Sequence, residues 1–127
     1  MPDKPEYNVQ VSVRTQYIAK QSDPAKDHFV FAYHVTIENR GTKAVKLMSR
    51  RWLIVDSDYR VQEVTGDGVV GKQPTIAPGK RFEYSSGCVL ETEVGTMEGH
   101  YDMVAEDGHP FTAQIAKFVL SAPRVVH

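Results

Sequence analysis

The residues that most resemble a chemical motif form a glycine loop, Gly66-x-Gly68-x-x-Gly71-Lys72. In dinucleotide-binding folds this glycine spacing allows a tight turn after a strand, and the helix that follows points its N-terminus at a pyrophosphate. Here residues 72–78 contain two prolines, which prevent a helix of useful length. Asp67 also adds a negative charge to the loop. The sequence therefore excludes a Rossmann-type nucleotide site.

Two interpretations of the glycine loop remain open. In the first, the glycines only supply turns between strands, because glycine accepts a positive φ without steric cost. In the second, backbone N–H groups form a concave site for an anion, aided by nearby cationic side chains. This second interpretation predicts binding of a phosphate-containing small molecule, either pyrophosphate or a nucleotide, at Gly66, Gly68, Gly71 and Lys72.

A second candidate is the run Arg50-Arg51-Trp52, which contains the only tryptophan of the chain. Arginine and tryptophan are enriched at the energetic centres of protein interfaces, so the run is a candidate interaction patch. The alternative is that Trp52 fills the core, as one large aromatic residue often does in β-sandwiches. The two arginines would then form a solvated strand edge that blocks unwanted pairing.

The other reactive side chains lack the spacing of a catalytic or metal site. The five histidines form no His-x-His or His-x-x-x-His pair. The run at residues 85–87 lacks the Gly-x-Ser-x-Gly pattern of a nucleophile elbow. Cys88, the only cysteine, is expected to be a small buried thiol. We expect no catalytic residue, no metal and no cofactor, and therefore no enzymatic activity.

The elements that must position these candidates are β-strands, because apolar residues recur with period two. The clearest strand places five apolar side chains on one face, Phe29, Phe31, Tyr33, Val35 and Ile37. The phase changes between Leu47 and Trp52, which predicts a β-bulge or a switch of sheets near residues 49–51. A second change of phase is expected before Phe118.

Strands at regular spacing with Gly and Pro turns predict an all-β fold, an immunoglobulin- or fibronectin type III-like β-sandwich of seven to eight strands. The 127 residues suit one domain over 1–127, with residues 1–6 and 124–127 frayed. Exposed strand edges in such a sandwich permit a homodimer by edge pairing.

The overall charge and hydropathy limit the classes of partner. The formal net charge is −1, which argues against nucleic acid as a partner because such domains carry a basic excess. No apolar run approaches the roughly 20 residues that cross a bilayer, so we expect no membrane association. The N-terminal segment is charged and differs from a secretory signal, so a cytoplasmic location is expected.

Several motifs in order along the chain resemble the ApaG family. They are Arg51-Trp52-Leu53-Ile54, the glycine loop through Gln73-Pro74, Pro78-Gly79-x-x-Phe82-x-Tyr84-x-Ser86, Gly95-x-Met97-x-Gly99-x-Tyr101-x-Met103 and Phe118-x-Leu120-Ser121-x-Pro123. The resemblance implies a fibronectin type III-like sandwich and a stand-alone bacterial cytosolic protein. One departure is Asp58-Tyr59, where family members often carry a glycine, so the type of this turn is left open.

The resemblance also implies a role in protein–protein interaction and an association with cobalt resistance and magnesium efflux. We therefore expect a non-enzymatic protein-binding or regulatory module that engages another protein through a sheet face or edge. The alternative is the phosphate-containing ligand at residues 66–72. Because no metal-ligand set is apparent in the sequence, we expect any link to divalent metals to be indirect.

Overall fold

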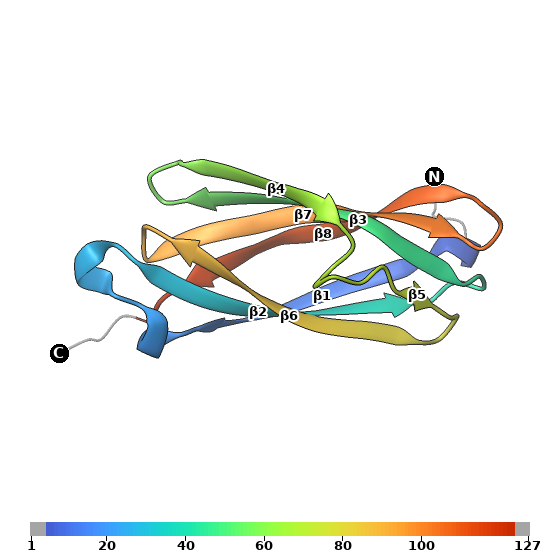
Figure 1. Cartoon of the computed structure of the whole chain (residues 1–127), viewed down its shortest axis with the longest axis horizontal. Helices are drawn as coiled ribbons and strands as arrows, with labels where there is room; N and C mark the ends of the chain where they lie inside the picture. The colour runs from blue at the N-terminus through green and yellow to red at the C-terminus, as the bar shows by residue number, and fades with distance from the viewer. Residues whose placement is uncertain (1–4, 124–127) are drawn as a thin grey trace.

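The computed structural model describes residues 5–123 and folds them into two antiparallel sheets packed face to face (Figure 1). The first sheet has the order β1-β2-β6, with β1 (Val9–Tyr17), β2 (Phe29–Asn39) and β6 (Arg81–Leu90). The second has the order β4-β3-β7-β8, with β4 (Val61–Asp67), β3 (Val45–Asp56), β7 (Val94–Ala105) and β8 (Pro110–Ser121). The short β5 (Thr75–Ile76) pairs with the start of β3. The predicted all-β sandwich is confirmed.

The remaining regular elements are three short 3-10 turns, η1 (Pro5–Tyr7), η2 (Ala19–Gln21) and η3 (Pro24–Lys26). In η1, the hydroxyl group of Tyr7 donates to a carboxylate oxygen of Asp107 in the β7–β8 turn, and its ring stacks 4.2 Å from that of His109. Fraying was expected for residues 1–6 and 124–127. Residues 5 and 6 lie in η1, and the rest of these ends lie outside the described residues. No helix in the described part of the chain has the length and apolar character needed to cross a bilayer.

The core lies between the sheets and follows the alternation seen in the sequence. Along β2 every second residue is buried, beginning with Phe29. Trp52 of β3 is the largest buried side chain and contacts aromatic rings from three other strands, those of Tyr33, Tyr101 and Phe118. The interpretation of Trp52 as a core residue is confirmed, since only 2% of its surface is exposed.

Both predicted changes of phase are register shifts in the second sheet. The pairing of β3 with β7 shifts between Leu47 and Ser49, just before the predicted range. This bulge turns the carbonyl group of Met48 to receive hydrogen bonds from Gly68 N and from the side chain of Gln73. The pairing of β7 with β8 shifts opposite the segment before Phe118. The bulge in β3 therefore places the glycine loop.

The two long edges of the sandwich differ. On one side β1 lies against β8, so the edges of the two sheets meet. On the other side the edge strands are β4 and β6, which belong to different sheets (Figure 1). Residues of both strands line a hollow between them. Of the candidate residues, Arg50 and Trp52 line a cavity on this open side.

Candidate functional site

The hollow between β4 and β6 contains two adjacent cavities that share Ile54, Gln62 and Val89 in their walls. The larger cavity, of about 860 Å³, lies beside the turn that joins β3 to β4. The smaller, of about 310 Å³, is lined by Arg50 and Trp52 among others. We call the two cavities together the β4–β6 groove and the smaller one the Arg50 cavity.

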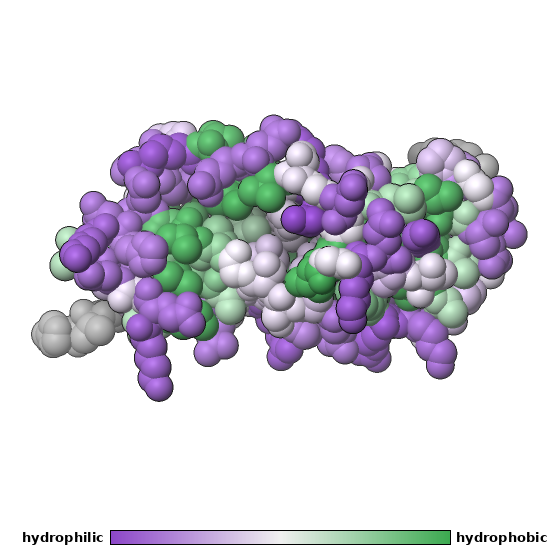
Figure 2. Space-filling view, in the orientation of Figure 1, coloured by the Kyte–Doolittle hydropathy of each residue, from purple (hydrophilic) through white to green (hydrophobic). Residues whose placement is uncertain are grey.

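The groove exists because β4 forms an edge and contributes little to the core. The register pairs Trp52 with Val64 and Ile54 with Gln62, so Val64 and Gln62 lie on the face of β4 that borders the hollow. Val64 remains 39% exposed and Val89 of β6 45% exposed. Figure 2 shows hydrophobic surface in this opening, framed by hydrophilic side chains. Apolar surface gathered in one hollow is typical of a binding site.

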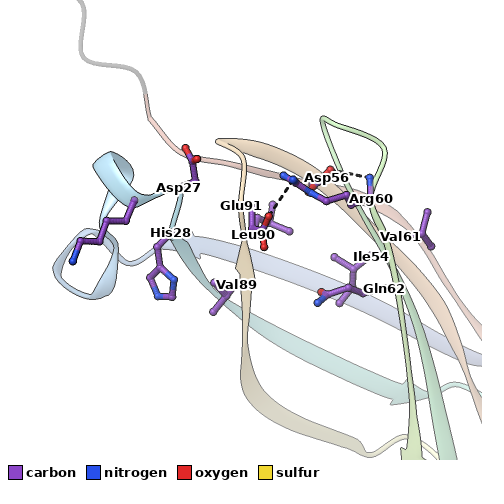
Figure 3. A pocket seen from close by; sticks show the side chains of 11 residues that line it. Asp27, His28, Ile54, Asp56, Arg60, Val61, Gln62, Val89, Leu90 and Glu91 are labelled. Atoms are coloured by element: carbon purple, nitrogen blue, oxygen red, sulfur yellow. Dashed lines mark hydrogen bonds and ion pairs between the residues drawn. The ribbon is translucent and has the colours of Figure 1, made fainter.

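An arginine bridge crosses the groove at the end near the β3–β4 turn. Arg60 forms ion pairs with Asp56 at 2.7 Å and with Glu91, the residue that follows β6, at 3.1 Å (Figure 3). Burial alone would raise the pKa of Asp56. Hydrogen bonds from the side chain and backbone of Arg60 and from the backbone of Asp58 outweigh burial and hold this pKa below its usual value. The bridge fixes the turn relative to β6 at this end.

The Arg50 cavity contains a cation without a counter-charge. Nη1 of Arg50 donates to the carbonyl oxygens of Asp67 at 3.1 Å and Gly68 at 2.9 Å. No carboxylate within residues 5–123 forms an ion pair with it, whereas Arg51 pairs with Glu63 and Arg60 with three acidic residues. The indole nitrogen of Trp52 is buried and also has no hydrogen-bond partner in the described chain. The site thus offers donors and positive charge.

Side chains with nucleophilic potential near this cavity are held neutral. Burial raises the pKa of the Cys88 thiol to about 11 and that of the Tyr84 hydroxyl to about 12. Burial also raises the pKa of Tyr33 and of Tyr101, and the Tyr101 hydroxyl lies 2.5 Å from that of Tyr84. The positive charge of Arg50 opposes the rise at all three tyrosines. Neutral, buried groups of this kind are poor nucleophiles.

The structure divides the glycine loop between a strand and a turn. Gly66 belongs to β4, where a Cβ would lie 2.8 Å from the Arg50 guanidinium, so its small size makes room for that group. Gly68 and Gly71 have the positive φ values of turn residues. The N–H of Gly68 donates to Met48, and those of Val69 and Lys72 donate to each other's carbonyl groups.

These hydrogen bonds bear on the predicted anion site. Because three N–H groups of the loop already donate to carbonyl oxygens, at most those of Val70 and Gly71 are left for an anion in residues 68–72. Lys72 lies beside them and is exposed. The binding of a phosphate-containing ligand at Gly66, Gly68, Gly71 and Lys72 stays a prediction, with fewer donors than the glycine spacing suggested.

The Arg50-Arg51-Trp52 run does not form one surface. Successive residues of a strand point to opposite faces, so Arg50 and Trp52 face the inside of the sandwich while Arg51 lies on the outer face beside Glu63. Binding by the run stays a prediction, but only Arg50 and the buried Trp52 border the groove, whereas Arg51 does not. The sequence reasoning missed that Arg50 and Val89 border one hollow, and no local pattern could reveal it, because the two residues come from different sheets.

A second arrangement missed from the sequence lies on the outer face of the first sheet. His34 contacts Ser85 Oγ at 2.8 Å and Glu83 Oε1 at 3.0 Å. This order of groups resembles a hydrolytic triad, yet all three side chains sit on a sheet surface and line neither cavity of the groove. His34 of β2 is the cross-strand partner of Ser85 of β6, so the cluster is a set of polar side chains that pair across neighbouring strands. No group of three or more metal-ligating side chains occurs in residues 5–123.

Comparison with known proteins identifies close relatives. A family model described as the ApaG domain matches residues 19–105. The chain is 57% identical to Protein ApaG of Thiobacillus denitrificans over 127 residues, all of both chains. It is 54% identical to Protein ApaG of Pseudomonas putida over 123 residues, 97% of this chain and 98% of the relative. The crystal structure of an ApaA protein from Bordetella pertussis superposes with a TM-score of 0.92 at 52% identity, covering 98% of this chain and 100% of that one.

Proposed function

This chain belongs to the ApaG family, and we propose that it is a non-enzymatic protein-binding module that holds an extended segment of a partner protein in the β4–β6 groove. The observation that carries the proposal is the apolar surface of the groove. Val64 stays exposed on the groove-facing side of β4, beside its buried partner Trp52. Val89 of β6 is exposed at the rim of the groove, because alternation with the buried Cys88 and Leu90 turns its side chain toward the outer face of the first sheet. Apolar surface left open in this way is stabilised when a partner covers it.

The partner is proposed to be extended because both walls of the groove are strand edges. β4 ends the second sheet and β6 ends the first, so each presents backbone N–H and C=O groups along its outer side. An added strand can pair with such an edge while its alternate side chains enter the pockets beneath. A groove between two edges favours an extended segment over a helix, because a helix satisfies its own backbone groups.

The chemistry of the groove supports binding over catalysis. The raised pKa values of Cys88 and Tyr84 keep both groups protonated at neutral pH. Asp56 and Arg60 are used in the bridge across the groove. A reactive site would instead need a group whose pKa lies near the working pH.

The proposal also includes the type of sandwich, the location of the protein in the cell and the link to divalent metals. The order β1-β2-β6 against β4-β3-β7-β8 supports a sandwich of the fibronectin type III kind. The free buried thiol of Cys88 supports a reducing, cytoplasmic location. A link to cobalt resistance or magnesium efflux would act through the bound partner, since the proposed site uses no metal.

Site-specific photo-crosslinking tests the groove directly. A photoreactive phenylalanine analogue replaces Val64 in the groove or Val89 at its rim. The matched control places it at Val119 on β8, which is 57% exposed. After irradiation of cells that make each variant, we expect one shared adduct from Val64 and Val89 and none from Val119. Mass spectrometry of the adduct should place both crosslinks within one short segment of the partner.

Two results would contradict the proposal. Equal adducts at all three positions would show nonspecific contact, and their absence at both groove positions would show that no partner lies there. An adduct between two copies of this chain would show that the occupant of the groove is a second copy of the chain and not a different protein.

A further inference from the structure

We infer that the Arg50 cavity receives a carboxylate side chain, Asp or Glu, of the extended segment held in the groove. This inference rests on the proposed function and specifies its partner: a segment with an acidic residue flanked, at the second position on each side, by apolar residues. The guanidinium group of Arg50 would bind the carboxylate, and Val64 and Val89 would contact the apolar side chains.

The first support is the charge of Arg50. Its side chain is half-buried beside Trp52 and the hydroxyl-bearing rings of Tyr33 and Tyr84, and no acidic residue in the described chain neutralises it. Withdrawing a cation from water is unfavourable unless a counter-charge approaches it. The two carbonyl groups that it contacts compensate only in part, because they carry no net charge. An anion supplied by a partner would complete this site.

The second support is the way the guanidinium group is held. Both contacts with Asp67 and Gly68 use Nη1, so this nitrogen anchors the group against the end of β4. The absence of a Cβ at Gly66 lets the guanidinium lie close to the strand. Arginine offers further N–H donors in a planar fork that matches two carboxylate oxygens. A fixed fork loses little conformational freedom when it binds such a group.

The third support is the rest of the cavity wall. Its volume of about 310 Å³ accommodates a single side chain, and its wall includes the apolar residues Ile54 and Met97. A side chain that fills the cavity displaces water from beside the guanidinium group, and a charge-assisted hydrogen bond is stronger where water is excluded. The wall residue Trp52 also carries an indole N–H that no described residue accepts. The Arg50 guanidinium group is the cationic donor that borders the cavity, and it favours an acceptor-bearing, negatively charged ligand.

A matched pair of peptides tests the inference on the intact protein. The probes are acetyl-Val-Thr-Glu-Thr-Val-amide and its glutamine counterpart, which differ only in charge and place Val, Glu or Gln, and Val on one face of an extended chain. The readout is the single indole N–H resonance of Trp52 in 15N-labelled protein. We expect the glutamate peptide to shift this resonance saturably and to bind at least about tenfold more tightly than the glutamine peptide.

Two variants assign the effect to Arg50. Arg50→Lys keeps the positive charge but loses the planar fork of donors. This variant should bind the glutamate peptide about tenfold more weakly than the wild type, while its amide spectrum remains that of a folded protein. Arg51→Gln is the control, because Arg51 lies on the outer face of β3, and it should bind as the wild type does. If Arg50→Lys does not fold, the two peptides on the wild-type protein still decide the question.

Other outcomes overturn the inference. Equal binding of the two peptides, or no indole shift with either, would rule out a carboxylate as the ligand of the Arg50 cavity. Shifts with inorganic phosphate alone would indicate a phosphate ligand instead. Failure here leaves the photo-crosslinks at Val64 and Val89 unaffected, so a partner without an acidic residue remains distinguishable from no partner at all.

Discussion

The backbone of the glycine loop turns through left-handed conformations at three of four consecutive residues. The φ angles are +61° at Gly68, +44° at Val70 and +78° at Gly71. Gly68 also lies against its own turn, since a Cβ there would approach the carbonyl oxygen of Lys72 to 2.1 Å. At Gly71 a Cβ would meet open space. Gly68 is therefore required both by its positive φ and by the lack of space for a Cβ, whereas Gly71 is required by its positive φ alone.

This difference predicts unequal effects of alanine at the two positions. Gly68→Ala should lower the free energy of unfolding by about 2 to 4 kcal/mol, because left-handed strain adds to a backbone clash. Gly71→Ala should lower it by only about 1 kcal/mol, from the strain alone. Urea denaturation followed by Trp52 fluorescence measures both. Equal losses would mean that the contact with Lys72 relaxes without cost.

Tyr59 shows how far a single residue could be understood from the sequence. The sequence does not define the type of the turn at Asp58-Tyr59. The structure gives Tyr59 a φ of +64° with 86% of its surface exposed, so it adopts the conformation that glycine favours. The Asp56 side chain accepts hydrogen bonds from the backbone of Asp58 and Arg60 and holds the turn despite that strain.

At the scale of elements, the hairpin formed by β3 and β4 depends on Asp56. Burial would raise the pKa of this carboxyl group, but the hydrogen bonds that it accepts from the turn and its ion pair with Arg60 hold the pKa below its usual value. A carboxyl group whose pKa is lowered by folding stabilises the protein above its unfolded pKa. That stability is lost as the pH falls through the lower, folded pKa.

Acid unfolding of an Asp56→Asn variant tests this dependence. The wild-type protein should lose stability as the pH falls below about 4, with part of the loss due to Asp56. The variant should be less stable at pH 7 and should lose less on acidification, because asparagine does not titrate. Urea unfolding at several pH values between 2 and 7 measures both slopes. Parallel curves for the two proteins would exclude Asp56 as a source of the pH dependence.

The sequence predicted the elements better than their relative placement. Alternation identified β2 and its buried face, because alternation is a local property of one strand. The break in phase before Trp52 predicted a bulge or a switch of sheets near residues 49–51, and the register shifts just before that range, at Met48. The open side of the sandwich was not predicted. It depends on which strands become edges, and that is decided by pairings between residues far apart in the chain, such as those of β6 with β2. The same reason hid the placement of Arg50 beside Val89.

At the scale of the whole molecule, tyrosine hydroxyl groups connect parts that are distant in sequence. Tyr84 of the first sheet and Tyr101 of the second share a hydrogen bond across the core. Tyr7 binds Asp107 and so attaches η1 to the β7–β8 turn, and this hydrogen bond raises the pKa of Tyr7 to about 12. Burial raises the pKa of Tyr84 to about 12 and that of Tyr101 further still. Folding therefore requires several phenols to stay protonated.

Alkaline titration should consequently unfold the protein. A group whose pKa is raised by folding contributes stability that is complete below the unfolded pKa, near 10 for tyrosine, and lost as the pH rises through the folded value. We expect the free energy of unfolding to fall steeply between about pH 10 and 12. Absorbance at 295 nm should then show a cooperative ionisation that coincides with the loss of Trp52 burial.

The variant Tyr84→Phe separates the phenol from the packing of its ring. The slope of the free energy of unfolding against pH reports how many protons the chain releases when it unfolds. Removing one phenol with a raised pKa should lower that number by up to one between about pH 10 and 12, so the fall in stability becomes shallower. The loss of the hydrogen bond to Tyr101 should lower stability at pH 7 by about 1 kcal/mol. An unchanged alkaline slope would show that Tyr84 ionises without unfolding the core. The hydroxyl pair would then contribute to stability at neutral pH alone, and the loss of stability in alkali would come from the other phenols with raised pKa values, those of Tyr7 and Tyr101.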